Sequence, residues 1–134
     1  MALFRSEGFD ELIDDLSAHK MDFVRAAPAM LKAGSDVVVD CWKRATEKHK
    51  LVDTGDMINS IAAAPVKGNG MACEVYPQGV DRKGIRNAEK AFINHYGTSS
   101  RKATHFVDDA EAEAEAPAVE AMANAWDTYF EQEG

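Results

Sequence analysis

The feature that most constrains the fold is a stripe of apolar residues at helical spacing in the first third of the chain. It begins with four residues at i, i+3, i+4 and i+7, separated by acidic residues: Phe9, Leu12, Ile13 and Leu16. It resumes with Phe23, Val24, Ala27, Met30, Leu31, Gly34, Val37, Val38, Cys41, Trp42 and Ala45. We therefore expect a helical hairpin or one long interrupted helix over residues 9–49. Pro28 should kink it or mark a restart, because proline removes a backbone donor.

A second helical pattern closes the chain, from Thr104 onward. Its apolar face comprises Val119, Met122, Ala123, Trp126, Tyr129 and Phe130. Pro117 is expected to kink this helix or to be the first residue of a new one. The stretch AEAEAEAPA is predicted to be a solvated helical face rather than a functional acidic tract, because alanine and glutamate are both good helix formers.

The middle of the chain carries a short β pattern. Residues 62–67 and 70–77 flank Gly68-Asn69 and predict a β-hairpin with a glycine-containing turn. The polar segment 77–87 predicts a loop. Residues 87–98 fit a short helix ended by Gly97 or a strand from Ala91 to Tyr96, and periodicity does not decide between them.

Composition excludes several classes of function. The 134 residues suit one domain, spanning 1–134, with a hydrophobic core. The net charge of −8 argues against broad binding to nucleic acid, which needs clustered lysine and arginine. Cys41 and Cys73 are too few and too far apart for a disulfide framework or a zinc site. No signal peptide and no apolar run of about 18 residues is found, so we expect no membrane association and synthesis in the cytoplasm.

The tripeptide Asp53-Thr54-Gly55 admits two interpretations. After a hydrophobic pair it is typical of the catalytic carboxylate of an aspartic protease, and short retropepsin-like enzymes work as homodimers that share one proton between two such carboxylates. Alternatively, Asp53 or Thr54 caps a helix whose first turn contains Asp56. The helical patterns on both sides favour the helix start, because the protease motif lies between strands of an all-β body.

The remaining polar residues give no strong signal for catalysis. No pair of histidines has the spacing of a zinc-binding helix. His95 is expected to pack beside Tyr96, and His105 to be a polar residue at a helix start, so neither a metal nor a cofactor is predicted. The basic residues at the end of the first helical pattern suit a helix C-terminus, where the macrodipole is negative: Lys43, Arg44, Lys48, His49 and Lys50. A second basic concentration marks either a contact surface for an acidic partner or DNA, or ordinary solvated loop charge. It comprises Arg82, Lys83, Arg86, Lys90, Arg101 and Lys102.

Two stretches taken together resemble a known family. The first is VDTGDMINSI after a long helix, and the second is AFINHYGTSSRKATHFVDDA before the last helix. This layout is similar to the tailed-phage head–tail joining or tail-completion proteins, also labelled minor tail components or neck proteins. The matching positions are Asp53, Thr54, Gly55, Met57, Ser60, Ile61, Tyr96, Gly97, Thr98, Ala103 and Phe106. The resemblance implies structural roles for them: Ser60 bonds to nearby backbone, Gly97 supplies positive φ, and Phe106 anchors the last helix in the core. Many relatives have proline before the first element and before the last helix, where this chain has Leu51-Val52 and His105.

The resemblance implies an α+β domain: a long N-terminal helix, a small antiparallel sheet with a hairpin near 62–77, and a C-terminal helix packed on the sheet. It implies a non-enzymatic virion protein, assembled in the host cytoplasm into a ring of about six at the neck or head-proximal tail end. The expected partners are further copies of the chain, the head connector or adaptor proteins, and the tail tube or tail terminator protein. DNA would pass through the channel without specific binding. The alternatives are the homodimeric protease using Asp53 and a plain helical adaptor.

Overall fold

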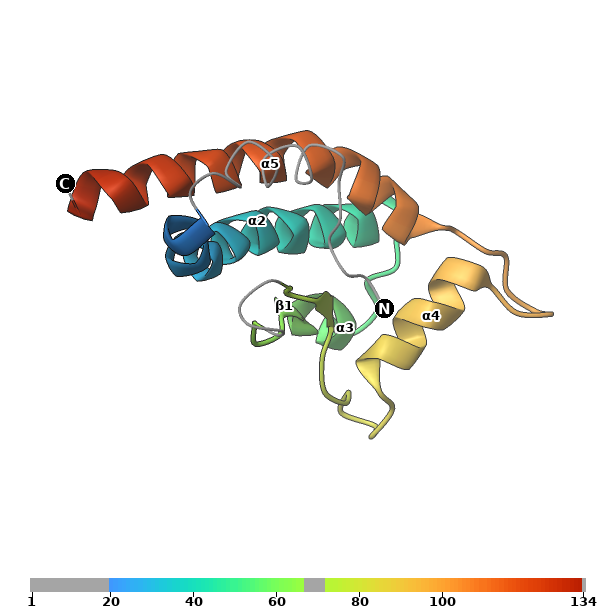
Figure 1. Ribbon diagram of the computed structural model, residues 1–134. Helices are drawn as coiled ribbons and strands as arrows, with labels where there is room; N and C mark the ends of the chain where they lie inside the picture. Colours follow the sequence, from blue (N-terminus) through green and yellow to red (C-terminus); the bar gives the residue numbers. More distant parts are fainter. Residues whose placement is uncertain (1–19, 67–71, 134) are drawn as a thin grey trace.

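The computed structural model describes residues 20–66 and 72–133, and two long helices dominate it (Figure 1). In chain order the elements are α2 (Lys20–Lys48), α3 (Asp56–Ser60), β1 (Ile61–Ala63), β2 (Val75–Pro77), α4 (Asn87–Tyr96) and α5 (Phe106–Glu133). The predicted α+β class is confirmed. The predicted stripe over residues 9–16 and the Gly68-Asn69 turn lie outside the described residues. Over the described ranges, no helix is long and apolar enough to cross a membrane.

The helices α2 and α5 lie side by side along most of their length (Figure 1). The α5 residues that are fully buried recur every four positions: Phe106, Ala110, Ala114, Ala118 and Met122. Small side chains at this spacing let two helix backbones approach closely. Gly34 of α2 contributes to the fit, because a Cβ atom there would lie 2.9 Å from Cγ of Met122. The C-terminal helix therefore packs mainly on α2, and not mainly on the sheet as the family resemblance implied.

The alternating AEAEAEAPA stretch has two different faces. Its glutamates are exposed, as predicted for a solvated face, whereas Ala110, Ala114 and Ala118 form the buried seam against α2. No new helix starts at either proline. Pro28 lies inside α2 and Pro117 lies inside α5. The carbonyl groups left without a helical donor belong to Val24 and Glu113, four residues before each proline, and both residues are exposed, so these groups can bond to water.

The sheet is a two-stranded antiparallel pair, as predicted. Its register pairs Ile61 with Pro77 and Ala63 with Val75, and the Ala64 amide extends it by donating to the carbonyl oxygen of Glu74 at 2.7 Å. Val75 and Ile61 are almost fully buried and join the core formed by α2 and α5. The sheet therefore lies against α2, on the side away from α5 (Figure 1).

An aromatic pair marks the centre of the core. Trp42 of α2 and Phe106 of α5 are both fully buried, and their rings meet edge to face with centroids 5.7 Å apart. Phe106 thus anchors the start of the last helix, as its place in the second motif segment predicted. The choice left open for residues 87–98 is also decided, because Asn87–Tyr96 is a helix that ends at Gly97.

Candidate functional site

The Asp53-Thr54-Gly55 segment forms the turn that leads from α2 into α3. Gly55 is the N-cap residue of α3 with φ 90° and ψ −7°, a left-handed conformation that glycine adopts without a steric cost. The Thr54 hydroxyl accepts a hydrogen bond from the Asp56 amide at 3.3 Å. The prediction that this turn starts a helix is confirmed. The predicted cap residue, Asp53 or Thr54, is wrong, because the chain turns one position later and Asp53 stays exposed.

The short helix α3 fixes the rest of the first motif segment. Met57 and Ile61 are buried in the core. The Ser60 hydroxyl donates to the Met57 carbonyl oxygen at 2.6 Å, which satisfies this side chain locally, as predicted for a serine at this position. These three residues therefore attach the turn to the core and leave its outer side facing solvent.

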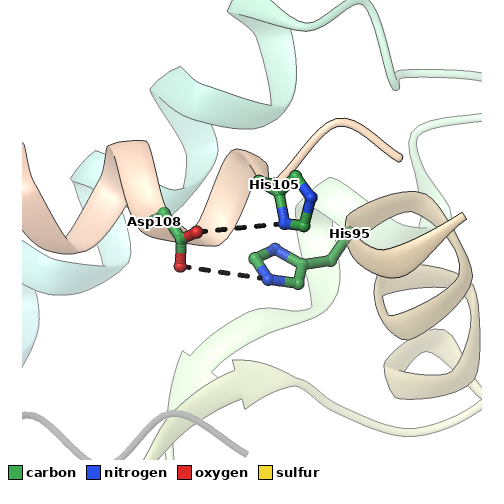
Figure 2. Close-up of side chains that lie close together, drawn as sticks. All are labelled: His95, His105 and Asp108. Carbon is green, nitrogen blue, oxygen red and sulfur yellow. Dashed lines mark ion pairs between the residues drawn. The ribbon is translucent and has the colours of Figure 1, made fainter. Parts of the chain in front are cut away.

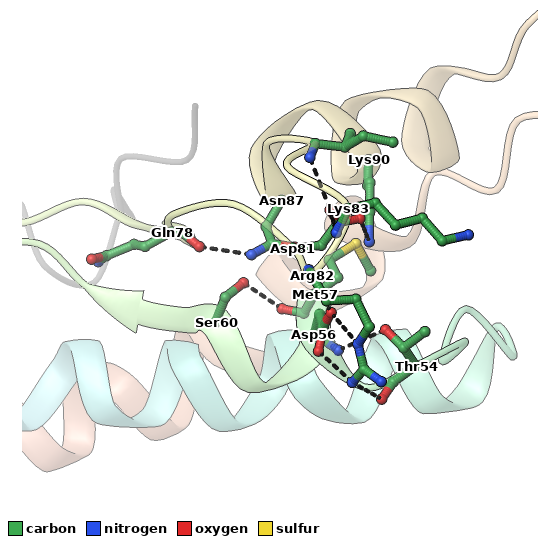
Figure 3. Close-up of polar contacts among 11 residues, drawn as sticks. Thr54, Asp56, Met57, Ser60, Gln78, Asp81, Arg82, Lys83, Asn87 and Lys90 are labelled. Atoms are coloured by element: carbon green, nitrogen blue, oxygen red, sulfur yellow. Dashed lines mark hydrogen bonds and ion pairs between the residues drawn. The ribbon is translucent and has the colours of Figure 1, made fainter.

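Asp56, the residue after the tripeptide, is held by Arg82 from the polar loop (Figure 3). The Asp56 carboxylate accepts hydrogen bonds from the Arg82 backbone amide at 3.0 Å and from its guanidinium at 2.9 and 2.8 Å. These hydrogen bonds hold the pKa of Asp56 well below its usual range. Arg82 was a predicted partner-binding residue, but its guanidinium is instead bound to a carboxylate of its own chain.

The polar loop between β2 and α4 is built around the buried carboxylate of Asp81. One oxygen accepts the backbone amides of Lys83 and Ile85, both at 2.8 Å, and the other lies 2.5 Å from the ammonium group of Lys90. The hydrogen bond from Lys90 is the main reason why the pKa of Asp81 is lowered. The loop is therefore internally bonded, and its contact with Asp56 through Arg82 ties it to the first motif segment (Figure 3).

The second motif segment turns sharply at Gly97. Its φ of 78° and ψ of −179° lie in a region open essentially to glycine alone. A Cβ atom at this position would lie 2.6 Å from the Ala103 nitrogen and 2.7 Å from the Arg101 oxygen. Thr98 and Arg101 then close a tight turn by exchanging backbone hydrogen bonds. Positive φ at Gly97 was predicted; the close approach of Ala103 was not.

Asn94 connects this turn to α4. Its carbonyl oxygen accepts hydrogen bonds from the Thr104 amide at 3.1 Å and the Thr104 hydroxyl at 2.7 Å. Its side-chain oxygen accepts a hydrogen bond from the Arg101 guanidinium. Asn94 is almost fully buried, and sequence reasoning gave it no role, because an asparagine within a helical pattern carries no signal of its tertiary partners.

The two motif segments meet across one cleft of about 660 Å³. The Asp53-Thr54-Gly55 turn forms one wall, and the 101–104 segment forms another. Of the described residues that line it, Asp53 alone is acidic, whereas four are cationic: Lys50, Lys90, Arg101 and Lys102. Its apolar lining comprises Leu51, Val52, Met57, Ile58 and Ile93. Lys90 is already paired with Asp81, so Lys50, Arg101 and Lys102 give the cleft its excess of positive charge over Asp53, in a chain of net charge −8.

The structure divides the six basic residues that were predicted as a partner interface. Lys90, Arg101 and Lys102 line the cleft, but Arg82 and Lys83 do not, and Arg86 borders a separate groove beside Phe92. Lys50 was not included in that prediction, because the basic residues at 43–50 were attributed to the end of the first helix. Its position three residues before Asp53 was the signal that could have added it.

The two histidines of the second motif segment, His95 and His105, lie as predicted. The His95 ring meets Tyr96 edge to face with centroids 4.5 Å apart. His105 directly precedes α5 and has a left-handed φ of 50°. The sequence did not predict that these histidines would approach each other.

Comparisons of the chain with protein-family models, with curated proteins and with solved structures find no match.

Proposed function

We propose that this chain is a structural subunit of a tailed-phage virion, a head–tail joining (neck) or tail-completion protein. Copies of the chain form a ring that links the head connector to the tail tube around the DNA channel. The proposal rests on the two motif segments that resemble this family and on how the chain uses them.

The convergence of these two segments on one cationic cleft is the observation that carries the proposal. They are separated by about thirty residues in the sequence, yet Thr54 and Thr104 line the same cleft. Within each segment the conspicuous polar groups are engaged in internal bonds, as for Asp56 with Arg82 and Asn94 with Arg101. This arrangement suits a rigid docking surface, because loops fixed by internal bonds lose little freedom when a partner binds.

A ring needs two different surfaces that fit each other, since head-to-tail contacts between identical subunits are heterologous. The cationic cleft is one such surface. The exposed surface of α5 is a candidate for the other, because it carries the exposed carboxylates of Glu111, Glu115 and Glu120, whereas Glu113 already pairs with Arg44. Opposite charges on the two surfaces of one chain favour this contact and disfavour contact between like surfaces.

The overall charge suits a conduit for DNA. A wall with excess negative charge does not retain a negatively charged polymer, so DNA could pass through the ring without specific binding. The cleft would meanwhile be covered by the neighbouring subunit, which removes its cations from the DNA path. The remaining partners would be the head connector or adaptor proteins on one side of the ring and the tail tube or tail terminator on the other.

Solution mass and electron microscopy test the ring directly. We expect concentrated protein to form particles of about six chains with a central opening, whose abundance falls when Lys50 and Lys102 are both replaced by glutamate. Lys83→Glu is the matched control, because Lys83 is exposed but lies outside the cleft. A stable dimer, or self-association that the double cleft variant leaves unchanged, would contradict the proposed contact.

Two further observations test the function itself. We expect genes for a capsid protein, a head connector and a tail tube to lie beside the gene for this chain. Pepstatin-sensitive peptide cleavage that disappears in Asp53→Asn would instead establish the protease.

A further inference from the structure

Two imidazoles and a carboxylate converge where α4 ends and α5 begins (Figure 2). Nε2 of His95 lies 3.9 Å from Oδ1 of Asp108, and Nδ1 of His105 lies 3.9 Å from Oδ2 of the same carboxylate. The potential ligand atoms of the three residues all lie within 4.8 Å of one another. These distances are too long for hydrogen bonds, so the three groups face a common point without bonding to each other.

The fold holds one of these side chains firmly and leaves the other two adjustable. The His95 side chain is 11% exposed and packs edge to face against Tyr96 and Phe106. The side chains of His105 and Asp108 are 58% and 68% exposed. The His105 amide donates to the His95 carbonyl oxygen at 3.0 Å, so the two backbones are joined at this point. Small rotations of the two exposed side chains can therefore change the size of the site.

Imidazole nitrogen and carboxylate oxygen are ligands that zinc and similar transition metals accept. Metal–ligand distances of about 2.0–2.2 Å in a tetrahedral site place neighbouring ligand atoms roughly 3.4 Å apart. The two histidine–carboxylate gaps of 3.9 Å involve different oxygens of Asp108, and the ligand atoms of the three residues all lie within 4.8 Å of one another. These separations exceed the tetrahedral value by at most about 1.4 Å, which rotation of the exposed Asp108 and His105 side chains can close. We propose that His95, His105 and Asp108 form a binding site for a divalent transition-metal ion, with Zn²⁺ as the best fit. Solvent completes the coordination on the exposed side.

The position of the site gives the metal a structural consequence. It joins the last turn of α4 to the first turn of α5, which are the two ends of the loop that carries Thr98 and Arg101. A bound ion would therefore stiffen the base of this loop. The inference is independent of the proposed ring, because it rests on a different group of residues.

One existing hydrogen bond must change when a metal binds. The Val107 amide donates to Nδ1 of His95 at 3.3 Å, so the neutral His95 ring carries its proton on Nε2, the atom that faces Asp108. Coordination through Nε2 needs that proton on Nδ1, and the Val107 amide must then turn to solvent. The half-buried Val107 is close enough to the surface for this exchange. The exchange weakens binding and makes the Val107 amide a specific reporter of it.

Titration of the full-length, tag-free chain with ZnCl₂ at neutral pH tests the site. Calorimetry should show saturable binding of one ion per chain, and the amide resonances of Val107 and His105 should shift together with it. Asp108→Asn and His105→Asn should each lower the affinity at least about tenfold, as expected when a metal centre loses an interaction that holds it. Asparagine is chosen at position 105 because it tolerates a left-handed backbone.

His49→Asn is the matched control, because His49 also contacts an aspartate, Asp109 at 2.6 Å, but lies outside the cluster. It should bind Zn²⁺ like the wild type, and circular dichroism should show all variants folded. The proposal is overturned if no saturable binding occurs up to millimolar Zn²⁺. It is equally overturned if the Asp108 and His105 variants bind as tightly as the wild type, or if the His49 variant loses as much affinity as they do.

Discussion

Gly97 offers a quantitative test of how the second motif segment is built. Its backbone lies in a region that costs other residues about 1–3 kcal/mol. In addition, a methyl group there would meet the Ala103 nitrogen at 2.6 Å and the Arg101 oxygen at 2.7 Å. Both are backbone atoms that cannot rotate away, so overpacking adds about 1–3 kcal/mol. We therefore expect Gly97→Ala to lower the free energy of unfolding by about 2–6 kcal/mol, a large part of the stability of a typical domain.

Gly84→Ala separates the two contributions. Gly84 also has a left-handed φ, 82°, but a Cβ atom there would meet no atom within 4 Å. The Gly84→Ala substitution should lower the free energy of unfolding only by the cost of the left-handed backbone, about 1–2 kcal/mol. Urea unfolding followed by circular dichroism gives both free energies, and comparable m-values would show that the two unfolded states expose similar surface. If Gly97→Ala lowers the free energy of unfolding by no more than Gly84→Ala does, the close approach of Ala103 is not a constraint. That result would refute this account of the turn.

Three further predictions concern the core and the first motif segment. Phe106→Ala should lower the free energy of unfolding by about 3–5 kcal/mol in urea titration, because it removes a fully buried ring from the contact with Trp42. Asp53→Asn should leave the melting temperature unchanged, since Asp53 is exposed and is not the N-cap residue. It should not weaken ring formation either, because it removes the one acidic group among the described residues that line the cationic cleft, so loss of assembly without unfolding would contradict the proposed contact. Because Arg82 lowers the pKa of Asp56, this carboxylate stabilises the fold above the unfolded pKa of about 4, and its contribution is lost as the pH falls below that value. Thermal melts from pH 6 to pH 2 should therefore show a larger loss of stability in the wild type than in Asp56→Asn, and equal losses would count against the Asp56–Arg82 pair.

The long helices could be predicted because their period is visible in the sequence. Met30, Val38, Cys41 and Trp42 were placed on one helical face and all are buried. The buried seam of α5 was not predicted, because alanines occur at every second position of the stretch and only every fourth residue is buried. Alanine contributes little apolar surface, so a pattern judged by large side chains misses a helix that packs through small ones.

The element that packs against each helix could not be predicted from periodicity. Periodicity shows that a face is buried, and it does not show which element covers it. The absence of bulk at Gly34 and Ala118, which lets α2 and α5 approach, has meaning only once both helices are known to cross there. The C-terminal helix was therefore assigned to the sheet by resemblance, and the structure places it on α2.

The candidate cleft shows a similar limit for charged residues. Lys50 and Lys102 are separated by about fifty residues, and only the tertiary structure brings them to one surface. Arg82 and Lys102 were both predicted from the sequence as partner-contacting residues, yet Arg82 is bound to Asp56 and Lys102 is not. A basic residue in a loop becomes available to a partner only if no carboxylate of its own chain has bound it first.

The same reasoning applies to the Asp-Thr-Gly element. An aspartic protease needs the first residue of the tripeptide as its functional carboxylate, whereas here the bonded carboxylate is that of Asp56, one residue after it. Gly55 makes this possible, because its left-handed turn directs the chain into α3 and brings Asp56 to the polar loop. Mutating Asp53 and Asp56 separately therefore distinguishes the two interpretations: a catalytic tripeptide depends on Asp53, and a structural turn depends on Asp56.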